Sequence, residues 1–356
     1  MNTSSPSPAG MTLDVALGLK RRDAGLPRPN VARPGGWIAS LRHRQDWPAS
    51  QPARFIEAAK YLVRALCLPR RHARYLRFVQ GHAPMRAFRR RDPRLLERHL
   101  HRFVNARWKR RDRLRALLAH YQFATSALPT PLFDAVYVEG GVPLGLLVLK
   151  DGRELILSLR PPLDKGCEGE LGIQLEGMDG RTLYRIVFTV IDDGRTLAIG
   201  CLQGPGGPDA REAVRELTRQ MHGLRPKQLM LALACAFARH FGIAQVLGIA
   251  NAAHPLSRRR AGIFQADYDA FWLEQQGVAE ADTGWFVLPA DPPRKAEADV
   301  PSHHRSAFRR REGLRAAAEA VLVRALCRSA PRADNATEMA AHFASTYASQ
   351  EHAWIP

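Results

Sequence analysis

The sequence predicts an α+β protein, in which a mixed and mostly antiparallel sheet packs with helices behind a basic helical region. Residues 53–125 place apolar side chains at helical spacing, with arginines on the remaining face. From Pro129 onward, short segments of alternating polarity are separated by turns that contain glycine, which is the pattern of antiparallel strands. Helical spacing returns near residue 209, so the second half of the chain combines strands with helices.

The individual elements follow from hydrophobic spacing and from turn residues. Helices are predicted at 55–68, 94–124, 209–222, 226–242, 268–277 and 305–328. Strands are predicted at 132–141, 143–152, 153–162, 169–180, 181–194 and 195–204, and later at 244–251 and 284–289. The turns GMDGR and DDGR indicate hairpins among the first six strands.

The chain divides into four predicted segments. Residues 1–50 are rich in Pro, Gly, Ser and Arg and are expected to form a flexible arm. Residues 51–128 form the helical basic region, and residues 129–328 form the sheet domain with its closing helix. Residues 329–356 are expected to be a loose tail, and no internal repeat is visible.

The composition, 46% hydrophobic and 24% charged residues, is that of a water-soluble globular protein. The sequence predicts no transmembrane helix, and its first residues lack the basic start and apolar core of a signal peptide. We therefore expect a cytoplasmic protein, which can also lie at the inner face of the inner membrane.

The cysteines and histidines do not suggest a metal site. The five cysteines are far apart, odd in number and without a C-x-x-C pair, so we expect buried thiols rather than disulfides or zinc ligands. His303 and His304 are adjacent, and no H-E-x-x-H occurs. Residues 204–208, GPGGP, lack the Gly-Lys-Ser/Thr of a P-loop, and no G-x-S-x-G elbow is present.

The net charge of +19 predicts attraction to polyanions, namely nucleic acid, anionic lipid or a phosphorylated ligand. Lysine accounts for only seven of the 53 basic residues, so an arginine bias in composition is an alternative explanation. The basic helix at 94–124 could lie on an anionic membrane or simply be solvated. Nucleic acid is the less favoured partner, since no basic and aromatic strand motif of an RNA-binding domain is visible.

The turn MHGLRPK, residues 221–227, raises the sharpest functional question. The helix that follows is apolar almost all round, which predicts burial against a sheet. Pro226 suits its first turn, but no Ser, Thr, Asp or Asn precedes it as a cap, and Arg225 and Lys227 flank the start. Positive charge at a helix N-terminus is unfavourable unless an anion binds there. The turn therefore either holds a phosphate or is a solvated helix start.

The order of elements from 180 to 290 resembles the core of GNAT-type acyltransferases. A strand is followed by a turn of the form Gln-x-x-Gly-x, a buried helix, a strand ending in Asn251 and an aromatic helix. The resemblance implies a GNAT-like sheet that binds acyl-CoA, with pyrophosphate at the turn and pantetheine along the preceding strand. The sequence departs from the motif at Arg225, where Gly or Ala is expected, and in an extra helix before the turn. The implied cofactor-binding residues are Leu202, Gln220, His222, Gly223, Leu224, Arg225, Lys227 and Asn251.

Three residues are candidates for proton transfer. Tyr268 stands where GNAT-type enzymes often place a general acid, although a packing role is an alternative. Asp269 and Glu274 follow on the same segment and could accept a proton or be surface charges. Two further carboxylates, Glu168 and Glu170, lie two residues apart at a strand start and are expected to share one face.

A second resemblance covers residues 55–325. The segments LTRQMHGLRPKQLMLA, IGCLQGP, YDAFWLEQ and FRRREGL are similar to those of the VirK/YbjX family of bacterial proteins. The resemblance implies an association with virulence and with envelope responses to cationic antimicrobial peptides, but no biochemical activity. Two functions remain open: an acyltransferase-like enzyme with a CoA-type donor, and a non-enzymatic regulatory or binding protein that engages anionic lipid or nucleic acid through Arg-rich helices.

Overall fold

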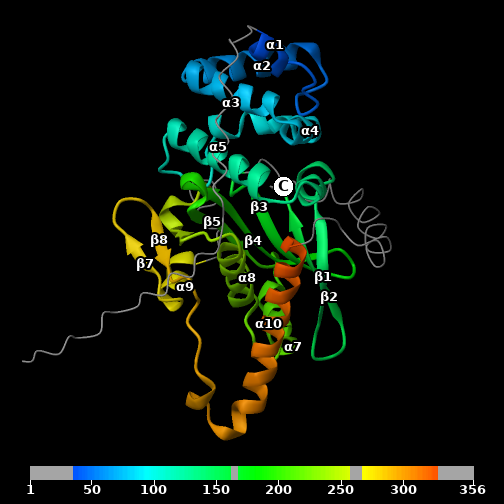
Figure 1. Cartoon of the computed structure of the whole chain (residues 1–356), viewed down its shortest axis with the longest axis vertical. Helices are drawn as coiled ribbons and strands as arrows, with labels where there is room; N and C mark the ends of the chain where they lie inside the picture. The colour runs from blue at the N-terminus through cyan, green and yellow to red at the C-terminus, as the bar shows by residue number, and fades with distance from the viewer. Residues whose placement is uncertain (1–34, 162–166, 257–266, 328–356) are drawn as a thin grey trace, which may run out of the picture. The chain divides into compact units, whose positions relative to one another are not determined.

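The computed structural model describes residues 35–161, 167–256 and 267–327 (Figure 1). The N-terminal part of this chain is helical. It contains α1 (Gly35–Ser40), α2 (Gln51–Leu66), α3 (Pro69–Gly81), α4 (Ala83–Arg91), the 3-10 turns η1 (Pro93–Leu96) and η2 (Arg98–Leu100), α5 (Arg110–Ala127), α6 (Thr130–Phe133) and the π-helical turn η3 (Asp134–Val138).

An open sheet follows, with eight strands among the described residues in the order β1-β2-β3-β4-β5-β6-β8-β7. The strands are β1 (Val142–Val148), β2 (Glu154–Arg160), β3 (Leu171–Gly177), β4 (Thr182–Ile191), β5 (Thr196–Gln203), β6 (Gln245–Ile249), β7 (Val278–Glu280) and β8 (Trp285–Leu288). The first five form an antiparallel meander, as the hairpin turns predict. The α+β class and the mostly antiparallel sheet are therefore confirmed.

One pair of strands is parallel. β5 and β6 are neighbours in the sheet, and the chain between them contains α7 (Ala210–Gln220) and α8 (Pro226–His240). A parallel pair needs such a crossover, because a hairpin can join only antiparallel strands. After β6 the chain forms η5 (Asn251–Ala253) and α9 (Tyr268–Glu274), and then β8 pairs antiparallel with both β6 and β7.

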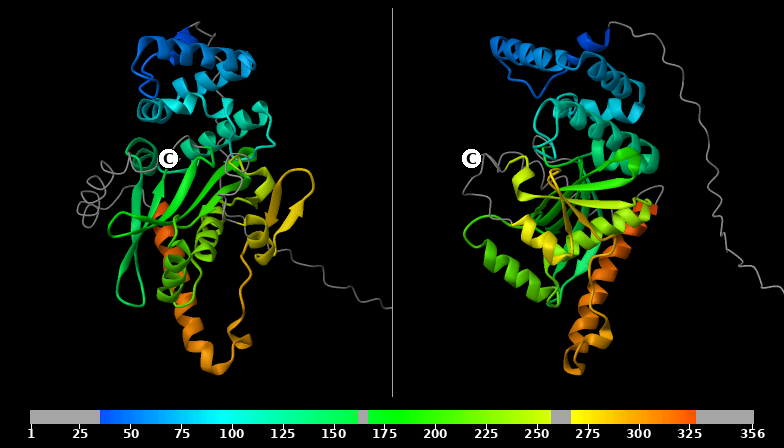
Figure 2. Two further views of the ribbon diagram at one scale, coloured as in Figure 1. Left: turned by 180° about the vertical axis from the view of Figure 1, so that it is seen from behind. Right: turned by 90° about the vertical axis from the view of Figure 1, so that its left-hand side faces the viewer.

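Helix α8 is the central covering helix, as its apolar sequence predicts. It contacts β3, β4, β5 and β6, and eleven of its residues are buried. The last helix, α10 (Arg305–Cys327), packs beside α8 and against β1 (Figures 1 and 2). One apolar core extends from Tyr75 in the helical region through the sheet to Leu326 in α10. Among the described residues, no helix is long and apolar enough to cross a membrane.

The predicted strand at 132–141 is wrong. This segment forms α6 and the π-helical turn η3 instead. Pro131 lies in the first turn of α6, where its missing N–H has no cost. Val136 and Tyr137 are both fully buried, and Tyr137 also pairs with the ring of His120. Buried apolar residues at neighbouring positions are thus compatible with a helical turn as well as with a strand, so this pattern does not distinguish the two.

The predicted helix at 94–124 is correct only from Arg110 onward. Before it, η1 and η2 lead into an irregular segment that bonds to distant parts of the chain. The N–H of Val104 donates to the carbonyl of Cys167, and the side chain of Asn105 donates to the carbonyl of Thr283. These long-range bonds replace helical ones, which local spacing could not predict.

Residues 35–50, assigned by the sequence to the arm, contain α1 and a turn around Arg44. The guanidinium of Arg44 is buried, bonds to Asp46 and Glu97, and lies 4.1 Å from the ring centroid of Trp47. Trp37, Leu41 and Trp47 pack with a small second core of Tyr61, Ala65 and Leu100. The predictions for 1–34 and 329–356 lie outside the described residues.

Candidate functional site

The candidate site lies where β5 and β6 separate. The two strands pair from Thr196 with Gln245 to Ile199 with Gly248, and β5 then continues to Gln203. In this gap the backbone N–H of Leu202 donates to the hydroxyl of Tyr268, at 3.0 Å. The carboxyl ends of parallel strands are a common place for ligands, because neighbouring chains diverge there.

A buried polar cluster surrounds this hydroxyl. His254 is fully buried, and its Nε2 lies 3.4 Å from the carboxylate of Glu168. Its Nδ1 accepts the N–H of Leu256, so a neutral ring carries its proton on Nε2, toward Glu168. The rings of His254 and Tyr268 are 5.6 Å apart. The thiol of Cys201 interacts with both Glu168 and Tyr268.

The cluster keeps its members in defined protonation states. Burial, together with the nearby Cys201 and Glu168, raises the pKa of Tyr268 well above its ordinary value. Burial alone would raise the pKa of Glu168, but the hydrogen bond with His254 and the charge of Arg185 hold it below its ordinary value. At neutral pH the cluster therefore holds a protonated phenol beside an ionised carboxylate. The Glu168 side chain remains 17% exposed, so a ligand can reach it.

The turn before α8 has an unusual backbone. His222 and Gly223 both adopt left-handed conformations, with φ of 55° and 82°. A Cβ on Gly223 would meet open space, so its role is conformational. The carbonyl of Thr218 accepts the N–H of Gly223, and Leu224 is fully buried. The turn is therefore held by the hydrogen bond to Thr218 and by the buried side chain of Leu224, while the space beside Gly223 is open.

Helix α8 begins as the sequence predicts, with Arg225 at the N-cap and Pro226 in the first turn. No side chain caps its start in the described structure, and its first turn contains no acidic residue. However, the guanidinium of Arg225 forms an ion pair with Glu274 of α9. Gln228 also approaches this carboxylate, at 3.4 Å. Arg225, which the sequence predicts to bind phosphate, and Glu274, which it predicts to accept a proton, are thus paired with each other.

Lys227 and Gln220 are held by other partners. The Nζ of Lys227 lies 4.4 Å from the ring centroid of Phe271, a cation–π contact. The side-chain amide nitrogen of Gln220 donates to Glu216, and the backbone carbonyl of Gln220 accepts the N–H of Lys150. Gln220 therefore joins α7 to the loop after β1, and its side chain is directed along α7 by this bond.

Asn251 fastens the end of β6 to the start of α9. Its backbone N–H donates to Asp269 at 2.8 Å, its side-chain oxygen accepts the N–H of Tyr268, and its side-chain nitrogen donates to Asp267. Asp267 in turn caps α9 by accepting the N–H of Ala270. Asp269 and Asn251 hold Tyr268 in place, and the backbone carbonyl of Asn251 also accepts the N–H of His254, at 3.4 Å.

The indole of Trp272 strengthens the same junction. Its Nε1 donates to the carbonyl of Ile249 at 2.8 Å, and its ring covers Gly248 so closely that a Cβ there would lie 2.5 Å from it. Tyr268 and Trp272 stack with an angle of 9° between their planes. Tyr268 is consequently positioned by several hydrogen bonds and ring contacts between α9 and the end of β6.

Glu168 and Glu170 do not share a face, contrary to the prediction. Glu170 is fully buried on the other side, where it pairs with Arg98 and accepts a bond from Tyr121. Burial raises the pKa of Glu170 to about 7, although Arg98 lowers it in part. The backbone turn between them sends the two carboxylates to separate networks. Sequence reasoning found Glu168 for the wrong reason and missed His254 and Cys201, which no recognisable spacing marks.

The cysteines differ partly from expectation. The cysteines of the described residues form no disulfide; Cys201 and Cys235 are buried as predicted, whereas Cys67 and Cys327 are exposed. Both exposed thiols lie at or just beyond helix ends, where the apolar pattern of a helix no longer guarantees burial.

Comparison with known proteins gives the family. Residues 51–321 match a family model described as a protein of unknown function (DUF535). The chain is 31% identical to the uncharacterized protein YbjX of Escherichia coli, over 71% of this chain and 78% of that protein. It is 28% identical to an uncharacterized protein of Haemophilus influenzae, over 59% of this chain and 69% of the relative.

A further relative is named membrane protein LapB, from Mannheimia haemolytica, with 28% identity over 42% of this chain and 63% of that protein. No solved structure matches the chain. The family model spans more than half of the sequence, and the similarity to YbjX agrees with the resemblance found in the motifs. The protein therefore belongs to the DUF535 family.

Proposed function

We propose that this protein transfers an acyl group from a CoA-type thioester to an amine or hydroxyl of an envelope component. The observation that carries the proposal is the separation of β5 and β6 beyond Ile199, where the buried phenol of Tyr268 bonds to β5. The partly exposed carboxylate of Glu168 belongs to the same polar cluster. The sheet order, with one parallel pair joined through a buried helix, is consistent with the GNAT-like core that the sequence resembles. The envelope acceptor follows only from the association implied by the VirK/YbjX resemblance.

The chemistry needs one base and one acid. The acceptor nitrogen or oxygen attacks the thioester carbonyl while Glu168 takes its proton, so the new bond to carbon forms as the carbon–sulfur bond breaks. Tyr268 gives its proton to the departing thiolate. Water then carries the proton from Glu168, whose side chain is 17% exposed, back to Tyr268. His254 holds the carboxylate in place through Nε2, since its Nδ1 accepts the N–H of Leu256. The net products are the acylated acceptor and free CoA.

The residues around α8 fit a phosphate with one condition. The uncapped helix start and the open left-handed turn favour an anion, and Arg225 can bond it at two points. In the structure this guanidinium is paired with Glu274, whose negative charge would repel a phosphate. Binding therefore requires Arg225 to exchange Glu274 for the phosphate. Both side chains are about 40% exposed, so this exchange has a small cost.

Calorimetric titration of the full chain with CoA and acetyl-CoA at physiological salt tests the proposal. We expect saturable binding that Arg225→Ala weakens by about tenfold or more. Arg215→Ala, which changes an equally basic but more exposed side chain on α7, is the matched control and should have no effect. No binding by protein shown to be folded by circular dichroism rejects the CoA donor.

A non-enzymatic role in binding polyanions is the second candidate. Arg111 and Arg115 at the start of α5 are mostly exposed, at 55% and 71%, and share a single nearby carboxylate, Asp112. Charge reversal between Arg107 and Arg115 should weaken binding to DNA or to anionic lipid, and added salt should weaken it steeply. Binding that does not depend on salt would count against this candidate.

A further inference from the structure

Helix α2 has two apolar faces, although only one of them is covered. Tyr61 and Ala65 point inward and are fully buried in the small second core. Four large apolar side chains point outward: Phe55, Ile56, Val63 and Leu66, which are 75%, 51%, 66% and 62% exposed. Only eight large apolar side chains are so exposed among the described residues, and half of them lie on this one helix.

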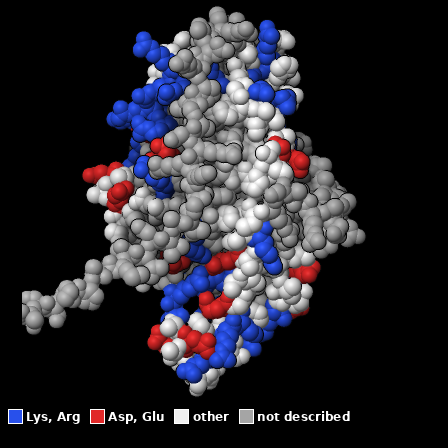
Figure 3. All heavy atoms as spheres, viewed as in Figure 1, with Lys and Arg blue, Asp and Glu red and all other residues white. Residues whose placement is uncertain are grey.

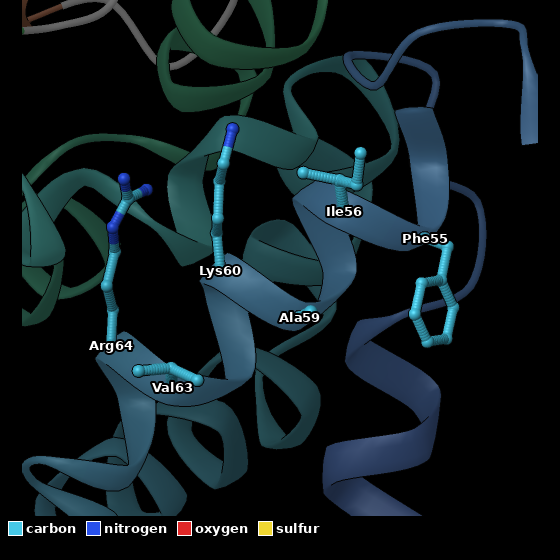
Figure 4. A pocket seen from close by; sticks show the side chains of 6 residues that line it. All are labelled: Phe55, Ile56, Ala59, Lys60, Val63 and Arg64. Carbon is cyan, nitrogen blue, oxygen red and sulfur yellow. The ribbon is translucent and has the colours of Figure 1, made fainter. Parts of the chain in front are cut away.

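The exposed side chains form one continuous stripe, which we call the α2 stripe and define as Phe55, Ile56, Ala59, Val63 and Leu66. Its members recur at helical spacing, so they line one side of the helix over nearly its whole length. Figure 4 shows Phe55, Ile56, Ala59 and Val63 along this side, around a shallow hollow. Scattered exposed apolar residues need no explanation, but a contiguous stripe usually marks an interaction surface.

Basic side chains border the stripe. Lys60 and Arg64 line the same hollow in Figure 4. The segment from Gln51 to Gly81, which holds α2 and α3, contains seven Lys and Arg but one acidic residue, Glu57. Exposed arginines follow on α3 at Arg70, Arg71, Arg74 and Arg77. In Figure 3, Lys and Arg also gather over the upper part of the face, where Figure 1 shows the helical region.

The positive charge around the α2 stripe decides which partner can cover it. A second copy of this chain would bring the same positive surface against the stripe and be repelled. The N-terminal residues 1–34 carry five basic residues and two acidic ones, so their charge does not complement the stripe either. An anionic lipid surface satisfies both properties, because apolar side chains enter the acyl boundary while Lys and Arg remain among the head groups.

We infer that the α2 stripe docks the protein onto the surface of an anionic phospholipid bilayer. Helix α2 lies in the plane of the interface, with Phe55 and Val63 inserted and Lys60 beside the lipid phosphates. This site involves none of the elements around Tyr268, so it is independent of the proposed acyl transfer. It also differs from the basic segment 107–115 that the sequence singles out, since the inserted apolar side chains are on α2.

Vesicle flotation of the full chain tests the inference. The vesicles are phosphatidylcholine alone or phosphatidylcholine with about a third phosphatidylglycerol. We expect binding to the anionic vesicles, weak binding to the neutral ones, and a loss of about tenfold or more in partitioning for Phe55→Ser/Val63→Ser. Val278→Ser is the matched control, because Val278 is 68% exposed on a different element, β7.

The substituted side chains are mostly exposed, so the double variant should keep its fold, which thermal unfolding checks. Wild-type protein that fails to bind anionic vesicles overturns the inference, as does a folded double variant that binds as well as wild type. A wild-type dimer that the double variant converts to a monomer, without vesicle binding, would assign the stripe to a second copy instead.

The exposed thiol of Cys67 provides a second readout. It lies directly after α2, four residues beyond Val63 and on the same side of the helix. An environment-sensitive fluorophore on Cys67, in a Cys327→Ser background, should shift to shorter wavelength when anionic vesicles are added. The same fluorophore on Cys327, in a Cys67→Ser background, should not shift. Equal responses at both positions contradict insertion of α2.

Discussion

The hydroxyl of Tyr268 accepts a hydrogen bond from the backbone N–H of Leu202 across the gap between β5 and β6. The resemblance to GNAT-type enzymes assigns Leu202 to the pantetheine strand and Tyr268 to proton transfer. Here Leu202 and Tyr268 are joined by one hydrogen bond, so the phenol lies at the edge of β5 where the strand no longer pairs with β6. The same phenol is held from behind by the Asn251 junction and by stacking on Trp272.

Removing this hydroxyl should separate function from packing. Tyr268→Phe keeps the ring stacked on Trp272 but leaves the N–H of Leu202 without its acceptor, so the free energy of unfolding should fall by about 1–3 kcal/mol. If Tyr268 is the general acid, acyl transfer should also fall about a hundredfold with CoA affinity unchanged. Chemical unfolding, calorimetry and a thiol-release assay measure the three quantities. Unchanged turnover would remove Tyr268 from the chemistry.

The pairing of Arg225 with Glu274 should limit phosphate binding. Glu274→Gln keeps the size of the side chain but releases the guanidinium, so CoA affinity should rise about two- to fivefold. Glu212→Gln, on the exposed surface of α7, is the control and should leave affinity unchanged. A fall in affinity for Glu274→Gln would mean that Arg225 serves the helix-helix contact and not the ligand.

The buried histidines should make the fold sensitive to acid. The pKa of His120 is lowered by burial, and further by Arg98, to about 3 from an ordinary 6.5. Its Nδ1 accepts the N–H of Val190 and its Nε2 faces the hydroxyl of Tyr137 at 2.8 Å, so the folded state has no room for a second ring proton. The unfolded chain therefore binds one more proton below pH 6.5, and stability falls as pH decreases toward 3.

This single group should contribute a slope of about 1.4 kcal/mol per pH unit between those two values. The difference in unfolding free energy between wild type and His120→Gln, measured from pH 7 to pH 4, isolates that slope. His303→Gln, an exposed histidine on another element, should show no such difference. Where the variant is too unstable, an NMR titration of His120 in the wild type serves, and an ordinary pKa would refute the expectation.

Local patterns in the sequence identified most of the sheet. Alternation and turn glycines located five meander strands, because such strands pair with their chain neighbours and the information stays local. The apolar sequence of α8 predicted its burial for the same reason. The failures at 132–141 and 94–109 occur where side chains or backbone groups contact distant parts of the chain. Neither the buried contacts of Tyr137 nor the bond from Val104 to Cys167 has a signature in short-range spacing.

The candidate site divides in the same way. The sequence by itself determined the turn before α8, its uncapped start and the candidates Tyr268, Arg225 and Glu274, because each is a feature of consecutive residues. Only the tertiary structure decided that Arg225 and Glu274 form a pair and that Tyr268 meets Leu202. It also assembled Glu168, His254 and Cys201, whose side chains come from separate segments. These residues are far apart in the sequence. They meet only because the sheet brings the start of β3, strand β5 and the chain after β6 close together.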